Sequence, residues 1–312
     1  MIKGLVFALI CVLVWGVSFV NTKALLVDFS SLEIQVLRFA MAWAVLAGVE
    51  CLLKIKPPAD HDERKDRWLF VGLGFWGVAL YQMLENCAIH YTNASNVSIL
   101  VAINPVVTAL LAWAFGFVSR PRWLFFVGFV VAISGVAMVS LDGLTEFHFR
   151  PVGDLMALGA MLSWGFYSML VEKSKRYSQV YVMRRAFGWS LVMMLPLLAF
   201  GLTSTGRTVM DGSLAVTIGG GANLARFSKL WNYVNLGVLG VLASAGCFVF
   251  WNTACARLGL VRCTLGIYVI PAVTVVFAFA FLGERMTLVS ACGAVLTLVG
   301  VLLSNGPLKK EK

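Results

Sequence analysis

Three charged side chains lie inside apolar stretches of the first half of the chain: Lys23, Arg38 and Glu85. At 1.5 Å per helical residue, all three come within roughly 6–10 Å of the same end of their stretches. Charges are costly in such surroundings, so these residues should face the protein interior and pair, or reach water. We favour a structural bridge from Glu85 to Arg38 or Lys23 that closes an outer gate. The alternative is that one cation binds a ligand carboxylate while Glu85 responds to a proton or a ligand amine.

Neutral polar and aromatic side chains also lie deep in apolar stretches. An indole N–H or a phenol hydroxyl in apolar surroundings needs a hydrogen-bond partner. Each group could bond a backbone carbonyl of a neighbouring helix, or the groups could together line a cavity for a small molecule. The residue types leave both alternatives open. The candidate lining residues are Trp15, Ser18, Tyr81, Asn86, Asn104, Trp164, Tyr167, Ser168, Trp251, Asn252, Tyr268 and Thr274.

Two prolines, Pro105 and Pro271, lie in the middle of apolar stretches. A proline inside a helix frees a backbone carbonyl and kinks the helix. The bend could simply shape a packed bundle, which tolerates proline. We favour a hinge beside a cavity, because the two prolines occupy matching positions in the two halves of the chain.

Motifs of soluble enzymes are missing from the sequence, which contains no HExxH, GxSxG or P-loop pattern and only three histidines. Gly72-Leu-Gly74-Phe-Trp-Gly77 matches the dinucleotide pattern GxGxxG, but it lies within an apolar helix and follows no strand. It therefore predicts close helix packing. The seven cysteines show no CxxC spacing and are interpreted as packing residues. We expect no enzyme, no cofactor, no metal site and no ATP-driven pump.

Composition indicates a multi-pass membrane protein. Of the 312 residues, 60% are hydrophobic and 13% are charged, and the mean hydropathy is +0.87. A soluble fold of this size would need more polar residues to cover its surface. The net charge of +10 comes from short basic clusters between apolar runs. That distribution indicates membrane topology and anionic lipid headgroups rather than a nucleic-acid partner.

The chain is predicted to be all-α, with ten transmembrane helices. A spanning helix needs about 20 mainly apolar residues, and the polar turn 90–95 divides one uncharged stretch that is too long for a single span. The ten ranges are 4–27, 31–53, 68–90, 94–118, 122–141, 152–173, 181–202, 233–257, 262–282 and 287–305.

Basic residues in the connections set the expected orientation. With the N-terminus inside, 18 Lys and Arg lie in inner segments and 5 in outer segments. Positive residues accumulate on the cytoplasmic side of membrane proteins. We therefore expect a cytoplasmic-membrane protein with both termini in the cytoplasm.

The two halves of the chain resemble each other. Trp15-Gly16 recurs 149 residues later, the segment from Arg38 to Trp43 recurs after 146, and Asn86 recurs as Asn252 after 166. Gly128 and Gly135 are matched by Gly293 and Gly300, each 165 residues later. Five helices per copy is an odd number, so the second copy should be inverted in the membrane. We divide the chain into a first repeat (1–141), an outer connector (142–151), a second repeat (152–305, with the long outer loop 203–232) and a basic tail (306–312).

Several ordered motifs resemble the drug/metabolite transporter superfamily, specifically its ten-helix EamA-type members. They are the stretch from Trp15 to Lys23 followed by Arg38-Phe39, the run from Pro271 to Gly283-Glu284-Arg285, and the closing glycine-spaced helix. The first half departs from this pattern, with Phe117-Val-Ser-Arg120 where the second has Gly283-Glu284-Arg285.

The resemblance implies a secondary carrier that moves a small polar or amphipathic metabolite, such as an amino acid or a vitamin, by alternating access. It leaves a homodimer open. The rival interpretation is a non-transporting membrane sensor or assembly partner on the same scaffold. A channel is disfavoured because the sequence offers no ring of like charges.

Overall fold

The computed structural model describes residues 2–91, 103–141, 151–202, 224–270, 273 and 288–304, with Lys23 described for its backbone only. Within these ranges the regular structure is helical, and each of the ten predicted ranges contains at least part of one described helix. In the described part of the chain, five helices are long and apolar enough to cross a membrane: Ser31–Leu52, Arg64–Ala88, Pro151–Lys173, Gln179–Gly201 and Leu230–Leu258.

Sixteen helical elements follow one another along the described part of the chain. They are α1 (Ile2–Leu25), α2 (Ser31–Leu52), α3 (Glu63–Leu73), η1 (Gly74–Leu80), α4 (Tyr81–Tyr91), α6 (Asn104–Ala114), α7 (Trp123–Leu141), α8 (Pro151–Lys173), α9 (Gln179–Leu202), η2 (Leu224–Ser228), α11 (Leu230–Gly237), η3 (Val238–Gly246), α12 (Cys247–Leu258), α13 (Leu260–Thr264), η4 (Leu265–Val269) and α15 (Leu288–Ser304).

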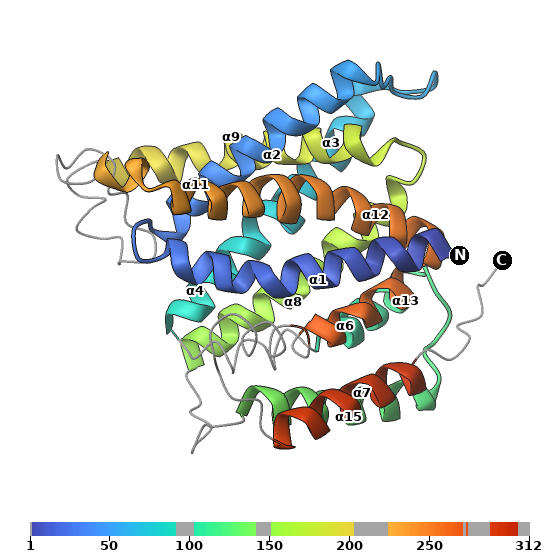
Figure 1. The fold of residues 1–312 in the computed structure, drawn as a ribbon. Coiled ribbons are helices and arrows are strands. Elements are labelled where there is room, and N and C mark those ends of the chain that lie inside the picture. Colours follow the sequence, from blue (N-terminus) through green and yellow to red (C-terminus); the bar gives the residue numbers. More distant parts are fainter. Residues whose placement is uncertain are drawn as a thin grey trace.

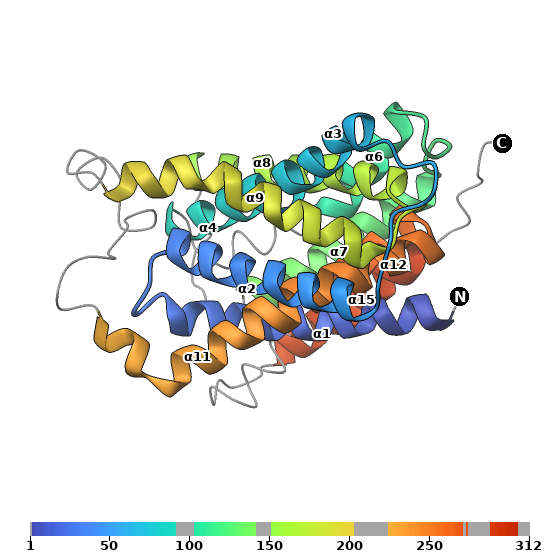
Figure 2. The same cartoon turned by 90° about the horizontal axis from the view of Figure 1, so that it is seen from above.

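The helices run roughly parallel or antiparallel to a common direction in one bundle (Figure 1). We call the end at which α1 begins the near end, and the opposite end the far end. In the turned view, α8 and α9 lie on the opposite side from α1 and α11, and α2 passes between α9 and η3, packing on both (Figure 2). Large apolar side chains such as Leu155 (67% exposed) and Leu302 (73% exposed) point outward. Such a surface suits contact with lipid tails rather than with water.

Local sequence signals explain where individual helices begin. Ser30 caps α2: its hydroxyl accepts from the Glu33 backbone N–H at 3.3 Å, and the Glu33 carboxylate accepts from the Ser30 N–H at 3.0 Å. This reciprocal pair satisfies two backbone donors that a helix start would leave free. Asp62 caps α3 in a related way, accepting from the N–H groups of Arg64 and Lys65.

Helices α7 and α15 pack side by side at one edge of the bundle (Figure 1). A Cβ added at Gly128 would lie 2.7 Å from the Gly300 oxygen, and one added at Gly135 would lie 2.5 Å from the Gly293 oxygen. In the repeat, Gly128 corresponds to Gly293 and Gly135 corresponds to Gly300. Replacing each glycine of the Gly128–Gly300 contact by its repeat partner therefore gives the Gly293–Gly135 contact, which is also present. The two helices therefore run antiparallel and meet through matching small residues.

Two π-helical segments, η1 and η3, interrupt long helices at matching positions of the two halves. Gly74 in η1 and Gly240 in η3 are 166 residues apart, the same offset as Asn86 and Asn252. A Cβ on Gly74 would lie 2.5 Å from the Ala186 oxygen of α9, and one on Gly240 would lie 2.8 Å from the Met41 Cβ of α2. In each half, the π segment thus packs closely on the second helix of the other half.

The GxGxxG pattern serves helix packing, as predicted. A Cβ on Gly72 would lie 2.9 Å from Leu170, and one on Gly77 would lie 2.0 Å from the ring of Tyr167. Both neighbours belong to α8. The glycines let the α3–η1 helix approach α8 more closely than any larger residue would allow.

Pro105 lies in the first turn of α6 rather than at a described mid-helix position. A proline there costs no helical hydrogen bond, because the first N–H groups of a helix have no partner inside it. The chain before Ile103, residues 92–102, lies outside the described residues, and so does Pro271. The predicted pair of hinges therefore remains a prediction.

Candidate functional site

Five predicted aromatic residues from α1, α4, α8 and α12 meet in the middle of the bundle, and we call them the central cluster: Trp15, Tyr81, Trp164, Tyr167 and Trp251. The ring centroids of Trp15 and Trp164 are 6.0 Å apart, and those of Trp15 and Trp251 are 5.1 Å apart. Trp164 also contacts Tyr81 at 4.8 Å and Tyr167 at 5.1 Å. The structure thus brings residues from both halves of the chain into one group, in which Trp15 is partly buried and the other four are buried.

The indole N–H groups of this cluster are not equally satisfied. Trp15 Nε1 donates to the Ala243 carbonyl of η3 at 3.0 Å. For Trp15, the indole N–H thus bonds a backbone carbonyl of a neighbouring helix, which is one of the two alternatives that the sequence left open. Trp164 is only 4% exposed, yet its Nε1 has no hydrogen-bond partner among the described residues. A buried unpaired donor costs about 1–3 kcal/mol. Among the described residues, Trp164 therefore has a hydrogen-bond donor without an acceptor.

A second buried network lies next to the central cluster. The Tyr167 hydroxyl donates to Asn252 Oδ1 at 2.8 Å, and Asn252 Nδ2 donates to the Met183 sulfur at 3.2 Å. All three side chains are fully buried. These bonds join α8, α9 and α12, so Asn252 acts here as a structural link between helices.

The charged pair predicted from sequence is close but not bridged. Arg38 Nε donates to Ser244 Oγ at 2.9 Å, and its Nη1 donates to Gln82 Oε1 at 3.3 Å. Glu85 accepts a hydrogen bond from the Tyr81 hydroxyl at 2.8 Å. Both charged residues are buried, at 7% and 8% exposure.

The favoured bridge joins Glu85 to Arg38 or to Lys23. Its Arg38 form is wrong, because no ion pair within 4.0 Å joins these two described side chains, and its Lys23 form stays a prediction. The physical reason is that neutral partners occupy both groups: Ser244 and Gln82 bind the guanidinium, and Tyr81 binds the carboxylate. The side chain of Lys23 lies outside the described residues.

The remaining predicted lining residues do not all lie at the central cluster. Ser18 donates to the Trp15 carbonyl at 2.8 Å, Asn86 is partly buried, and Ser168 is buried on α8. Asn104 and Tyr268 lie apart from the central cluster: Tyr268 packs in a separate apolar group with residues of α6, α7 and α13. Thr274 lies outside the described residues. The described ranges also contain no group of three His, Cys, Asp or Glu side chains able to hold a metal ion.

At the far end, a polar cluster joins the α1–α2 connection to η2 and α11, and we call it the far-end cluster. Arg226 forms a two-pronged ion pair with Glu33 at 2.9 and 3.2 Å and donates to the Asp28 carbonyl at 3.0 Å. Lys229 pairs with the Asp28 carboxylate at 2.7 Å. The Glu33 and Arg226 side chains are almost completely buried.

At the near end, a corresponding near-end cluster joins the α8–α9 connection to the start of α3. Arg176 pairs with Asp66 at 2.7 Å and with Asp60 at 2.9 Å. The Tyr177 hydroxyl donates to Asp66 at 2.5 Å, and His61 Nδ1 lies 2.9 Å from the same carboxylate. Burial, and then the hydrogen bond to Asp66, raise the pKa of Tyr177 to about 12.

Sequence reasoning missed both end clusters, although the repeat offsets could have revealed them. Asp28 and Tyr177 are 149 residues apart, and Asp60 and Arg226 are 166 apart, the offsets already seen in the repeat. The two ends have opposite charge arrangements. At the far end, the short α1–α2 connection carries the acid Asp28, whereas at the near end the short α8–α9 connection carries the base Arg176. Each cluster ties the two halves together at one end of the bundle.

The far-end cluster should weaken on acidification. Hydrogen bonds from Lys229 and Asn232 hold the pKa of Asp28 below its usual value near 3.8. A lowered folded-state pKa adds stability above the usual pKa, and that stability disappears as the pH falls through the folded value. Asp28→Asn should lower the melting temperature by about 2 °C at neutral pH.

Thermal denaturation of the purified protein from pH 7 downward measures this. The difference from wild type should shrink below about pH 4. Asp60→Asn serves as the control. The Asp60 side chain is 70% exposed, so loss of its ion pair with Arg176 should lower the melting temperature less. A difference for Asp28→Asn that is constant with pH would contradict the role of its charge.

Comparison with known proteins adds independent information. The model of the EamA-like transporter family matches residues 2–141 and 151–306. A relative from Streptantibioticus cattleyicolor, named "Probable terminal-alkyne amino-acid exporter", is 28% identical, with 96% of this chain and 93% of the relative covered. A relative from Escherichia coli, named "Probable amino-acid metabolite efflux pump", is 26% identical over 99% of this chain and 97% of its own. A solved crystal structure has the same fold, with a TM-score of 0.72, 14% identity and coverage of 97% and 96%.

Proposed function

The chain belongs to the EamA-like transporter family, and on this premise we propose that it is a secondary carrier that exports amino acids or compounds related to them. The protein crosses the cytoplasmic membrane with ten helices in two inverted five-helix halves, and it works by alternating access. The near end faces the cytoplasm together with both termini. The excess of Lys and Arg in the connections at that end supports this orientation.

The inverted arrangement is supported by paired contacts that survive exchange of the repeats. Gly128 meets Gly300 as Gly293 meets Gly135, and η1 packs on α9 as η3 packs on α2. Inverted repeats around a site near the membrane centre are a recurring basis of alternating access. The two end clusters fit this mechanism, because each closes one end and each must open in turn.

The observation that carries the substrate proposal is a group of buried charged and polar side chains that could bind a zwitterion. Arg38 and Glu85 carry opposite buried charges that are not paired with each other, and Trp164 has an unused donor. An amino acid in its zwitterionic form presents a carboxylate to Arg38 and an ammonium to Glu85. The printed names of the two relatives, both of which mention amino acids, favour the same class.

Counterflow in liposomes tests the function. Purified protein is reconstituted with a panel of unlabelled amino acids, amino-acid derivatives, vitamins and organic acids inside, and uptake of the labelled compound is followed. We expect exchange with at least one zwitterionic amino acid or derivative. Exchange with organic acids or vitamins alone would contradict the substrate class, and no exchange by folded protein would favour the non-transporting interpretation.

Trp164→Phe isolates the unused donor. The substitution keeps an aromatic ring in the central cluster but removes the N–H, so it should raise the KM for the transported compound by about tenfold, the worth of one good hydrogen bond. Stability should fall little, because no existing hydrogen bond is lost. The matched control is Trp15→Phe, which breaks the bond to Ala243 and should lower the melting temperature more than it changes KM. If KM is unchanged in Trp164→Phe, the indole N–H does not contact the substrate.

A further inference from the structure

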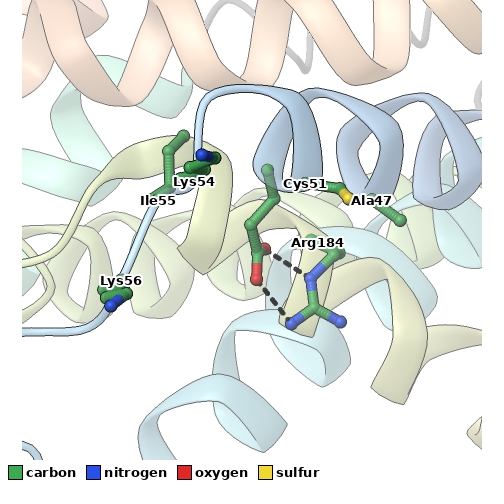
Figure 3. Close-up of a pocket in the computed structure, with 7 residues that line it drawn as sticks. Ala47, Cys51, Lys54, Ile55, Lys56 and Arg184 are labelled. Carbon is green, nitrogen blue, oxygen red and sulfur yellow. Dashed lines mark hydrogen bonds and ion pairs between the residues drawn. The ribbon is translucent and has the colours of Figure 1, made fainter.

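A pocket of about 350 Å³ opens at the near end, between the end of α2 and the first turns of α9 (Figure 3). It lies away from the central cluster, and none of the interactions described for transport uses it. The residues that line it are Ala47, Glu50, Cys51, Lys54, Ile55, Lys56 and Arg184.

The pocket carries an excess of positive charge. Arg184 forms a bidentate ion pair with Glu50, with Nε–Oε2 and Nη2–Oε1 distances of 2.5 and 2.9 Å, so these two charges neutralise each other (Figure 3). Lys54 and Lys56 are exposed and form no ion pair within the described part of the chain. The pocket therefore presents two uncompensated ammonium groups beside a fixed guanidinium.

The backbone at the end of α2 holds these lysines over the pocket. Lys54 has a φ of +50°, and the chain reverses there, with the Ile55 N–H donating to the Glu50 carbonyl at 3.0 Å. This conformation is unfavourable for a residue with a side chain. The turn nevertheless ends the helix at this level, and both lysines line the pocket together with Arg184.

Apolar side chains adjoin the charged pocket. Leu52 and Leu53, at the end of α2, are 82% and 67% exposed. Because α2 is one of the helices that can cross a membrane, its end lies where lipid headgroups begin. A ligand bound here meets basic groups at one end and an apolar surface at the other.

We propose that this pocket binds the headgroup of an anionic phospholipid, such as phosphatidylglycerol, from the leaflet at the near end. The ammonium groups of Lys54 and Lys56 bind the phosphate, and the acyl chains run along the exposed leucines of α2. Basic pockets between spanning helices hold anionic headgroups by this electrostatic attraction. The proposal requires that the chain lies in a membrane, but it is independent of the transported substrate.

Cys51 provides a reporter inside the pocket, since it is exposed there, and exposed Cys292 on α15 provides an internal reference. Protein in neutral detergent is reacted with an uncharged maleimide while phosphatidylglycerol or phosphatidylcholine is added, and the modification of each cysteine is followed by peptide mass spectrometry. Phosphatidylglycerol should slow the modification of Cys51 and leave Cys292 unchanged relative to phosphatidylcholine.

The variant K54Q/K56Q should need about thirtyfold more phosphatidylglycerol for half-maximal protection, since each of the two basic residues near the surface contributes about 1 kcal/mol. The matched control R120Q/R122Q loses the same charge at the same end, outside the pocket, and should behave as wild type. Equal protection of K54Q/K56Q, or equal protection by phosphatidylcholine, would overturn the proposal. Protection of wild type by inorganic phosphate at matching concentration would identify a soluble anion as the ligand and would also overturn it.

Discussion

Glu85→Gln is expected to reduce counterflow roughly hundredfold while the protein still inserts and folds. The amide keeps the size of the side chain and can still accept the hydrogen bond from Tyr81. It loses the negative charge, and hydrogen bonds to charged groups contribute about 1.5–3 kcal/mol. A substrate ammonium, or a transported proton, would therefore lose its partner at the centre of the bundle.

Transport by the variant is measured in liposomes over a range of pH, with Glu172→Gln as the matched control. Glu172 lies near the end of α8 and pairs with Lys175, so its replacement should leave the rate unchanged. A wild-type rate with the same pH dependence in Glu85→Gln would show that Glu85 is a dispensable structural partner, and the coupling role would fail. A normal rate with an altered pH dependence would restrict Glu85 to proton coupling.

The features that sequence predicts well here are those set by local composition and spacing. Apolar length identified the helices, and the matching glycine spacing on 128–135 and 293–300 identified the repeat, while the contact of these glycines between α7 and α15 comes from the structure. The deep aromatic residues, such as Trp15 and Trp164, were identified because indoles are unusual so far from a membrane interface. These signals depend on one residue and its immediate neighbours along the helix.

The features that sequence predicts poorly depend on which polar groups compete in three dimensions. A Glu85–Arg38 bridge is reasonable from depth alone, but the structure gives Arg38 two neutral acceptors, Ser244 and Gln82, from two other helices. Trp15 and Trp164 look equivalent in the repeat, yet only Trp15 meets a free carbonyl. The π-helical segments are likewise invisible in composition, because they change the hydrogen-bond register and not the residue types.

The asymmetry between the halves has a functional consequence. The repeat relates helices and small residues closely, but it does not preserve the pairing of charges: Arg38 has neutral partners, whereas the corresponding Arg184 pairs with Glu50 at the near end. Glu85 corresponds to Trp251 in the central cluster. A carrier with identical halves would treat both directions alike, so the charge differences are where a preferred direction of transport can arise.

Gly74→Ala is expected to destabilise the protein by roughly 1–3 kcal/mol, the usual cost of overpacking. Its new Cβ would lie 2.5 Å from the Ala186 oxygen and 3.2 Å from the Ser190 backbone nitrogen, so backbone and not a flexible side chain must move. This clash must outweigh the gain of up to about 1 kcal/mol that alanine normally brings to a helix. The contact joins η1 of the first half to α9 of the second.

Two other glycines turn this into a graded test, measured as unfolding midpoints in detergent. Gly48→Ala on α2 meets no atom within 4 Å, so it should stabilise the protein slightly through helix propensity alone. Gly240→Ala, the repeat partner of Gly74, meets the Met41 Cβ at 2.8 Å and the Arg38 oxygen at 3.2 Å, and it should fall between the two because this closest contact is less severe than the 2.5 Å contact at Gly74. From the most to the least stable protein, the expected order is therefore Gly48→Ala, wild type, Gly240→Ala and Gly74→Ala. If Gly74→Ala were as stable as Gly48→Ala, the close approach of η1 to α9 would be wrong, and with it one of the contacts that supports the inverted arrangement of the halves.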